Sequence, residues 1–219
     1  MTDSTYTALL ELSVSVLLLC AVLVVWRREL RTLVRLLAVQ GFALAAIPAI
    51  RGGHTRDWTL LAVAVGVAAL RSALLPSLLR RVLRDAGEAR ETEPLVNTTA
   101  SMLAVAALTV LAYAVARPLV DLDPTPATRA APAALAVILT GIFVLISRRR
   151  ALSQVVGFLL MDNGITAVAF LTTAGVPLVV ELGASLDLLF AVLVLQVLAG
   201  RLRLAFGSAD LDELRELHD

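Results

Sequence analysis

The sequence predicts an all-α membrane protein that crosses the bilayer about seven times, and three observations support this. Hydrophobic residues make up 59% of the 219 residues and charged residues 17%, whereas soluble domains are about 45–50% apolar and about 25% charged. The mean hydropathy is +0.87. The apolar residues also gather in long runs, and lipid can act as the solvent for surface that so short a chain could not bury.

Seven apolar runs approach the roughly 20 residues that a helix needs to cross a hydrocarbon core of about 30 Å. The runs cover approximately residues 6–26, 33–50, 58–79, 98–116, 130–146, 151–176 and 178–202. Helices satisfy every backbone polar group in lipid, and the runs are too long for the strands of a membrane barrel. A tight external turn at residues 175–177, which contain Gly and Pro, is expected to separate the last two spans.

The distribution of arginine predicts the orientation, because loops rich in positive charge stay in the cytoplasm. With the N-terminus outside, thirteen arginines fall in cytoplasmic segments and four in external loops. The cytoplasmic set is Arg27, Arg28, Arg31, Arg80, Arg81, Arg84, Arg90, Arg148, Arg149, Arg150, Arg201, Arg203 and Arg215. This bias requires an odd number of crossings and a cytoplasmic C-terminus. The first run is interpreted as a membrane helix, because no basic leader or cleavage site accompanies it.

Two segments are predicted to lie outside the membrane. Residues 80–94 carry charges of both signs, which favours a cytoplasmic helix or loop. The tail at residues 208–219 is acidic with leucines on one side, which is consistent with either a short amphipathic helix or a frayed terminus.

A faint internal repeat links the second and sixth runs. Arg27 is followed after twelve residues by Gln40-Gly41, and Arg150 at the same spacing by Asn163-Gly164. Both segments follow a basic loop and place an amide and a glycine near mid-membrane. Two three-helix units joined by the fourth helix would produce this pattern.

Asp162 is the strongest candidate for a functional residue. It lies near the middle of the sixth run, where a carboxylate costs roughly 2.5–3.5 kcal/mol to insert. A carboxyl group that can be neutral or charged at this depth meets the chemical requirement for passing protons. The alternative is a buried structural hydrogen-bonding group, with Asn163 joining neighbouring helices.

Arg71 is the second candidate, well inside the third run. Arginine keeps its proton in proteins, so Arg71 must find a carboxylate, carbonyl groups or water. Pairing with Asp162 would create a charge-pair switch. The alternative is a side chain that extends to the cytoplasmic edge of the membrane. Pro76 removes one backbone hydrogen bond nearby and is expected to bend the helix.

Further polar residues are weaker candidates for a proton path. Asp187 lies deeper in the seventh run than Glu181, and the six-residue spacing turns the two carboxylates about 120° apart. Glu11 lies near the outer end of the first run, where contact with headgroups or water is the simpler account. Gln40 could extend a hydrogen-bonded water path or act only in packing.

The sequence contains no motif for catalysis or for a cofactor. It has no P-loop, no dinucleotide-binding glycine motif and no Ser/His/Asp set. Cys20 is the single cysteine, which excludes an internal disulfide and a cysteine-based metal site. No metal or redox centre is therefore expected in this chain. A net charge of +1 offers no basic field for nucleic acid.

Residues 148–203 resemble the membrane subunit called hydrogenase-4 component E, whose last three helices are similar to the K subunit of respiratory complex I. The matching features are the basic loop, the triplet Asp162-Asn163-Gly164, and an ELG motif with Asp187 six residues after its Glu181. The spacing from Arg71 to Pro76 also resembles a feature of the third helix in that family. The length and the seven-helix layout agree over essentially the whole chain.

The resemblance implies a non-catalytic subunit of a complex-I-like or group 4 hydrogenase-type assembly in a bacterial or archaeal cell membrane. Its partners would be antiporter-like subunits and subunits that link the quinone or hydrogenase module, and Asp162 would replace the glutamate usual in K-type subunits. A structural scaffold and a subunit of a cation/proton antiporter complex are the alternatives. A free-standing small-solute transporter fits less well, because the repeat joins helices of the same orientation.

The same reasoning divides the chain into four parts. An N-terminal three-helix unit with a cytoplasmic loop covers residues 1–97, and a linking helix with an external loop covers 98–129. A K-subunit-like three-helix unit follows at 130–205, and an acidic cytoplasmic tail at 206–219.

Overall fold

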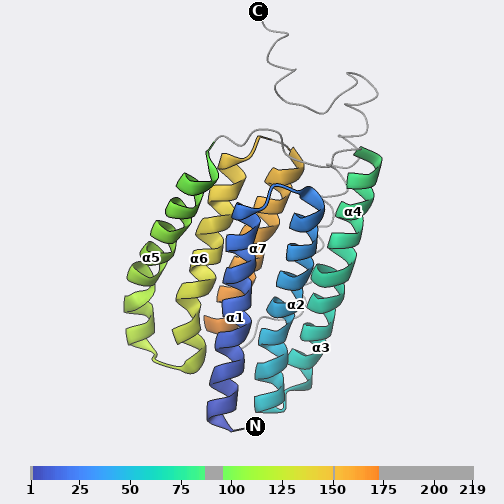
Figure 1. Cartoon of the computed structure of the whole chain (residues 1–219). Helices are drawn as coiled ribbons and strands as arrows, with labels where there is room; N and C mark the ends of the chain where they lie inside the picture. Colours follow the sequence, from blue (N-terminus) through green and yellow to red (C-terminus); the bar gives the residue numbers. More distant parts are fainter. Residues whose placement is uncertain (1, 87–95, 150, 173–219) are drawn as a thin grey trace, which may run out of the picture.

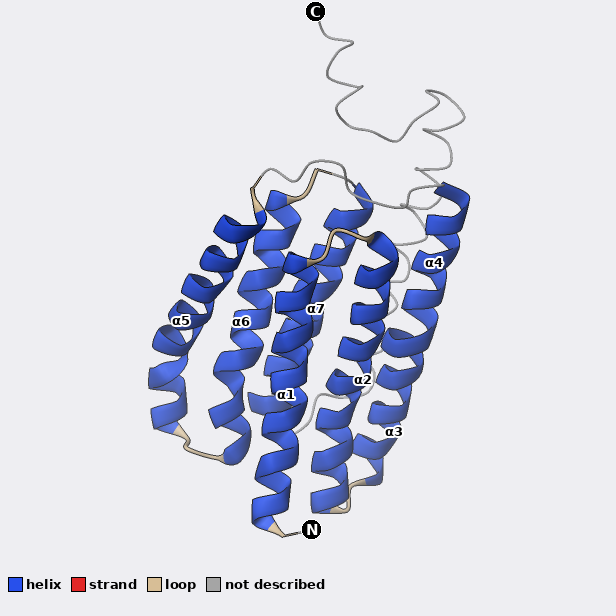
Figure 2. Cartoon of the chain, viewed as in Figure 1, coloured by secondary structure: helices blue, strands red, loops and turns tan. Residues whose placement is uncertain are grey.

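The computed structural model describes residues 2–86, 96–149 and 151–172, and every regular element in these ranges is helical (Figure 2). Six of the helices in this part of the chain are long and apolar enough to cross a membrane, which confirms the predicted class of all-α, multi-pass membrane protein. The predicted seventh span at 178–202, the turn at 175–177, the tail at 208–219 and most of the loop at 80–94 lie outside the described residues.

The observed helices extend several of the predicted spans. Their bounds are α1 Asp3–Trp26, α2 Leu30–Thr55, α3 Trp58–Val67, η1 Ala68–Leu74, α4 Leu75–Ala86, α5 Thr98–Leu122, α6 Pro126–Ser147 and α7 Ala151–Thr172. The elements α3, η1 and α4 follow one another without a break and together form the third span. The helix α5 continues through Pro118 to Leu122, six residues beyond the end at Ala116 that was predicted for the fourth span.

Four helices form the centre of the bundle, with α1 packed against α2 and α6, and α7 packed against α2 and α6. The helix α5 lies against α6 on one flank, and the α3–η1–α4 segment lies against α2 on the other (Figure 1). Large apolar side chains on α5, including Leu103, Val110 and Val115, are exposed, as expected for a helix that faces lipid. The bundle therefore places its shared interior between the two hairpins α1–α2 and α6–α7.

Small residues bring α6 and α7 into close contact. A Cβ atom added to Gly157 would lie 2.6 Å from the Leu145 nitrogen, and one added to Gly164 would lie 2.8 Å from the Ile138 nitrogen. Gly141 lies equally close to the backbone of Met161. Glycines commonly allow this approach between membrane helices, and here they fix the position of α7, which carries Asp162.

A capping box begins α6 and accounts for its start four residues before the predicted boundary. The Thr125 hydroxyl accepts a hydrogen bond from the Thr128 backbone N–H at 3.2 Å, and the Thr128 hydroxyl accepts one from the Thr125 N–H at 3.0 Å. Pro126 occupies the first turn, where its missing N–H costs no hydrogen bond.

Replacing this cap should measurably weaken the bundle. We expect Thr125→Ala to lower the free energy of unfolding by about 1 kcal/mol, because one backbone N–H loses its acceptor. The buried single cysteine, Cys20, provides the measurement, since a thiol-reactive dye labels it only when the helices separate. An unchanged melting temperature for Thr125→Ala would contradict the capping role.

The third span contains a π-helical turn, η1, directly before Pro76. Within it the Leu75 N–H donates to the Leu70 carbonyl, five residues back instead of four. Proline cannot donate the next helical hydrogen bond, and a wider turn is one way to absorb that loss. Such π turns often occur at functional sites, and this one carries Arg71.

Candidate functional site

Arg71 projects from η1 toward α7 and is only 3% exposed. Its guanidinium group forms an ion pair with the Asp162 carboxylate. It also donates hydrogen bonds to the Asn163 side-chain oxygen at 2.6 Å and to the Thr166 hydroxyl at 3.0 Å. These three acceptors lie on one face of α7, because residues three and four positions apart on a helix are neighbours. The expected pairing of Arg71 with Asp162 is thus present.

The polar network continues from α7 to α2 and α1. The Asn163 side-chain amide donates to the Gln40 side-chain oxygen at 2.9 Å. The Gln40 amide in turn donates to the Leu17 backbone carbonyl at 3.1 Å, and Gln40 is fully buried. A chain of hydrogen bonds therefore runs from the ion pair through α7 and α2 to α1.

These groups lie at a similar depth in the bundle. Leu17, Gln40, Arg71 and Asp162 each lie well inside an apolar span, at least nine residues from either of its ends. A salt bridge there loses the hydration of both ions, and it persists only where further hydrogen bonds satisfy the remaining polar atoms. The contacts from Asn163 and Thr166 to Arg71 provide such bonds.

Gly41 allows α2 to approach the backbone of Arg71. A Cβ atom at Gly41 would lie 2.6 Å from both the carbonyl carbon and the carbonyl oxygen of Arg71. Gln40 and Gly41 therefore act together, since the glycine admits η1 while the amide beside it reaches Asn163. The two amide–glycine pairs of the sequence repeat thus meet directly through the hydrogen bond between Gln40 and Asn163.

A pocket of about 220 Å³, including its open mouth, adjoins the network. Arg71 and Asn163 supply its polar wall, and Leu75, Pro76 and Leu79 continue it along α4. Buried water occupies sites that combine sufficient room with polar partners, so water entering this pocket would find polar groups at its inner wall.

The two charged residues differ in accessibility. The Arg71 side chain is 1% exposed, whereas the Asp162 side chain keeps 17% of its surface accessible among the described residues. The guanidinium group is a fixed positive charge, so the carboxylate is the partner that can gain or lose a proton. The arrangement can hold a compensated charge inside the membrane and can separate that charge if Asp162 takes up a proton.

The structure assembles four of the seven polar residues that the sequence singles out. Arg71, Asp162, Asn163 and Gln40 lie in one network. Glu11 is exposed on α1, nearer its N-terminus, and takes no part in these contacts. The positions of Glu181 and Asp187 lie outside the described residues.

Sequence reasoning missed two members of the network. Thr166 follows Asp162 by four residues and so shares its helix face, a signal that could have identified it. The role of the Leu17 carbonyl could not be predicted from the sequence, because every residue carries a backbone carbonyl that can accept a hydrogen bond.

The fold and this network define a multi-pass α-helical membrane protein with an ion pair in its interior. The chain is 54% identical, over 220 residues and the full length of both proteins, to the Mycobacterium tuberculosis protein named "Uncharacterized protein Rv0085". It belongs to the same family as that protein. No family model matches the chain, and no solved structure matches it.

A more distant relative is hydrogenase-4 component E. The chain is 35% identical over 119 residues to the proteins of that name from Escherichia coli strain K12 and from Shigella flexneri. The match covers 54% of this chain and 55% of each relative, so about half of either length is similar.

Proposed function

We propose that this chain is a membrane subunit of a complex-I-like or group 4 hydrogenase-type assembly and takes part in moving protons across the membrane. The similarity to hydrogenase-4 component E supports membership in such an assembly. The ion pair between Arg71 and Asp162, deep in the bundle, is the observation that carries the proton-transfer role. Other membrane subunits would be its partners, including antiporter-like ones.

Proton transfer would depend on breaking and reforming the ion pair. When Asp162 accepts a proton, the carboxyl group becomes neutral and Arg71 loses its counter-charge. The Asn163 and Thr166 oxygens keep two hydrogen bonds on the guanidinium group during this step. The same hydrogen bonds limit the cost of separating the charges, so the network would act as a switch with two arrangements.

Water and the amide chain would connect the switch to its surroundings. Water in the pocket beside Arg71 and Asn163 would deliver protons from the α4 side. Gln40 and Asn163 do not titrate, but they would hold such water and orient the ion pair. Glu181 and Asp187 remain candidates for the next carboxylates along the path.

The proposal includes the arrangement of the chain. The N-terminus would lie outside, and the C-terminus in the cytoplasm of a bacterial or archaeal cell. The hydrogen bond between Gln40 and Asn163 supports two related units, with α1–α2 and α6–α7 as matching hairpins. The unit boundaries at residues 97 and 130, with a linking helix between them, belong to the same proposal.

A structural scaffold is the second candidate function. The network could serve only to hold α1, α2, η1 and α7 together, because buried polar residues join membrane helices in many proteins. A cation/proton antiporter complex is a further possible setting, in which the same ion pair would contribute to exchange of ions.

The substitution Asp162→Asn tests the relay directly, because it preserves shape but removes the titratable group. The chain, tagged in its native host, is first co-purified with its partners. Inside-out membrane vesicles are then energised in turn with hydrogen, formate or NADH, and proton uptake is followed with a pH-sensitive dye. We expect the uptake that depends on this gene to fall by at least about tenfold, the lower end of what removing a proton-transfer group costs.

Asp162→Glu is the matched control, since it keeps a carboxyl group and should retain most of the gene-dependent uptake. The same partners should co-purify with each variant. Normal uptake with Asp162→Asn would refute the relay. Loss of the partners with Asp162→Asn would support the scaffold.

A further inference from the structure

Exposed arginines gather at the end of the bundle where α1 ends and α2 begins. They form a set that we call the arginine surface: Arg27, Arg31, Arg35, Arg80, Arg81 and Arg84. Arg27 lies 4.8 Å from the centre of the Trp26 ring, and the other five have no hydrogen-bond acceptor or ion-pair partner among the described residues. Glu29 is the one acidic side chain that the structure describes on these helices at this end. The surface therefore carries an excess of positive charge.

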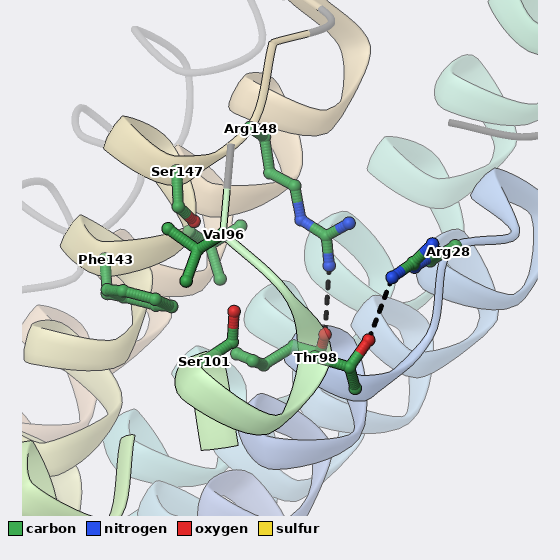
Figure 3. A pocket seen from close by; sticks show the side chains of 9 residues that line it. Arg28, Val96, Thr98, Ser101, Phe143, Ser147 and Arg148 are labelled. Carbon is green, nitrogen blue, oxygen red and sulfur yellow. Dashed lines mark hydrogen bonds between the residues drawn. The ribbon is translucent and has the colours of Figure 1, made fainter. Parts of the chain in front are cut away.

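Other arginines at the same end are held by the protein itself. Arg28 donates to the Thr98 hydroxyl at 3.0 Å, and Arg148 donates to the backbone carbonyls of Val24 and Val25 at 3.2 and 3.1 Å. Figure 3 shows both guanidinium groups directed inward, between α1, α5 and α6. The arginine surface is thus the part of this basic end whose charge meets the surroundings of the bundle.

Helix geometry places the arginine surface at the level of lipid headgroups. The contact between Gly41 and Arg71 fixes the register of α2 against the third span. Arg31 and Arg81 lie ten residues from that contact along their helices, which is about 15 Å and half of a hydrocarbon core of about 30 Å. Trp58, which is 82% exposed, begins α3 about 35 Å from Arg81 by the same measure. Exposed tryptophan is typical of the membrane interface, so this span reaches from one interface to the other.

The face of α2 that carries Arg31 and Arg35 continues as exposed apolar surface. Val39 is 51% exposed and Phe42 is 67% exposed. They share this face because residues three and four positions apart on a helix are neighbours. Trp26, also half exposed, ends the neighbouring helix α1. Positive charge at headgroup level above an apolar strip matches the two parts of a phospholipid.

We propose that the arginine surface binds anionic phospholipid, with Arg31 and Arg35 contacting the headgroup phosphate and Val39 and Phe42 contacting an acyl chain. Guanidinium groups suit phosphate because their donors match its oxygens. The long apolar stem of Arg35, one turn deeper than Arg31, lets its charged end reach the headgroups. Clusters of basic residues next to membrane helices attract anionic lipids. A free phosphate shares the headgroup chemistry but would leave the apolar strip uncovered.

Quenching of Trp26 by brominated phospholipid tests the proposal, because bromine quenches a tryptophan only at close range. The chain has two tryptophans, so the full-length Trp58→Phe protein reports on Trp26 alone. This protein is reconstituted in dioleoyl phosphatidylcholine vesicles that contain a rising share of brominated phosphatidylglycerol or brominated phosphatidylcholine. We expect phosphatidylglycerol to quench at a share at least about fivefold lower, which is the effect of one arginine near an anionic surface. Arg31→Gln/Arg35→Gln should remove that preference.

Arg117→Gln/Arg129→Gln is the matched control, because both arginines are exposed near the opposite end of α5 and α6 and the variant loses the same two charges. It should keep the preference, and dye labelling of Cys20 verifies that both variants are folded. An equal loss in the two variants would mean general attraction by charge and would overturn the site. Equal quenching by the two brominated lipids would overturn it too.

Two further outcomes would assign the surface to another ligand. Inorganic phosphate added at constant ionic strength should leave the preference unchanged, and its loss would identify free phosphate as the ligand. If Arg31→Gln/Arg35→Gln kept the lipid preference but no longer co-purified with its native partners, the arginine surface would be a protein-docking surface, and the lipid proposal would be overturned.

Discussion

Arg71→Met should destabilise the bundle by about 3–5 kcal/mol, because it leaves the Asp162 carboxylate in the membrane interior without its counter-charge. Asn163 and Thr166 also lose the donor that their side-chain oxygens accept. Methionine fills a similar volume, so the loss would come from charge and hydrogen bonding, with little contribution from a cavity. Dye labelling of Cys20 during heating or denaturant titration measures the change.

The double variant Arg71→Met/Asp162→Leu separates the charge effect from packing. Removing both members of a buried ion pair is often close to neutral, because no uncompensated charge remains. We expect the double variant to recover most of the stability that Arg71→Met loses. Arg80→Met is the control, since Arg80 is exposed on α4, and it should change stability by less than about 0.5 kcal/mol.

The same double variant distinguishes the two candidate functions. A scaffold needs only a stable bundle. If the chain is a scaffold, an Arg71→Met/Asp162→Leu protein that has regained its stability should support both assembly of the complex and gene-dependent proton uptake. A relay needs the titratable carboxyl group, so the recovered protein would assemble and fail to move protons. Full uptake in that variant would contradict the proposed function. A double variant as unstable as Arg71→Met alone would contradict the ion pair itself.

The sequence predicts the membrane helices well because hydrophobic length is a local property. Each described span overlaps its predicted run, and the ends differ where caps or prolines act, as at Thr125 and Pro118. The partnership of Arg71 with Asp162 could also be predicted, because a charge at membrane depth requires a counter-charge. Thus composition and the cost of burial determine much of both the fold and the site.

Contacts that depend on how a helix is rotated about its axis could not be predicted in this way. Apolar residues surround α7 on all sides, so its pattern does not indicate which face meets α6. The π turn at Arg71 depends on how the helix absorbs Pro76, and a single sequence does not specify that choice. A glycine in a membrane helix indicates a close helix contact but not which helix makes it. Gly41 is an example, because only the structure shows that its neighbour is the backbone of Arg71.

Gly141→Ala should be among the most disruptive of small substitutions in this protein. The added Cβ would lie 2.6 Å from the Met161 Cα and closer still to the Met161 backbone nitrogen. Carbon atoms pack at about 3.5–4.0 Å, so α6 and α7 would have to separate by roughly 1 Å. Backbone atoms cannot rotate away as a side-chain end can, and we expect a loss of about 2–3 kcal/mol, the upper part of the range for overpacking.

The effect should reach the ion pair, because Met161 precedes Asp162 on α7. Moving this turn of α7 away from α6 changes the position of the carboxylate relative to Arg71, and a displacement of about 1 Å can cost a reaction about a hundredfold. Gene-dependent proton uptake should therefore fall further than the amount of folded protein does. Quantifying the folded complex in the same vesicles separates the two effects.

Gly66→Ala is the matched control within a membrane helix, since no atom lies within 4 Å of the Cβ position there. Alanine is a better helix former than glycine by roughly 0.5–1 kcal/mol, so this variant should melt at the same or a higher temperature. Similar melting of Gly141→Ala and Gly66→Ala would refute the close packing of α6 on α7. Since that packing fixes the position of Asp162, the same result would remove the geometric basis for the expected loss of proton uptake.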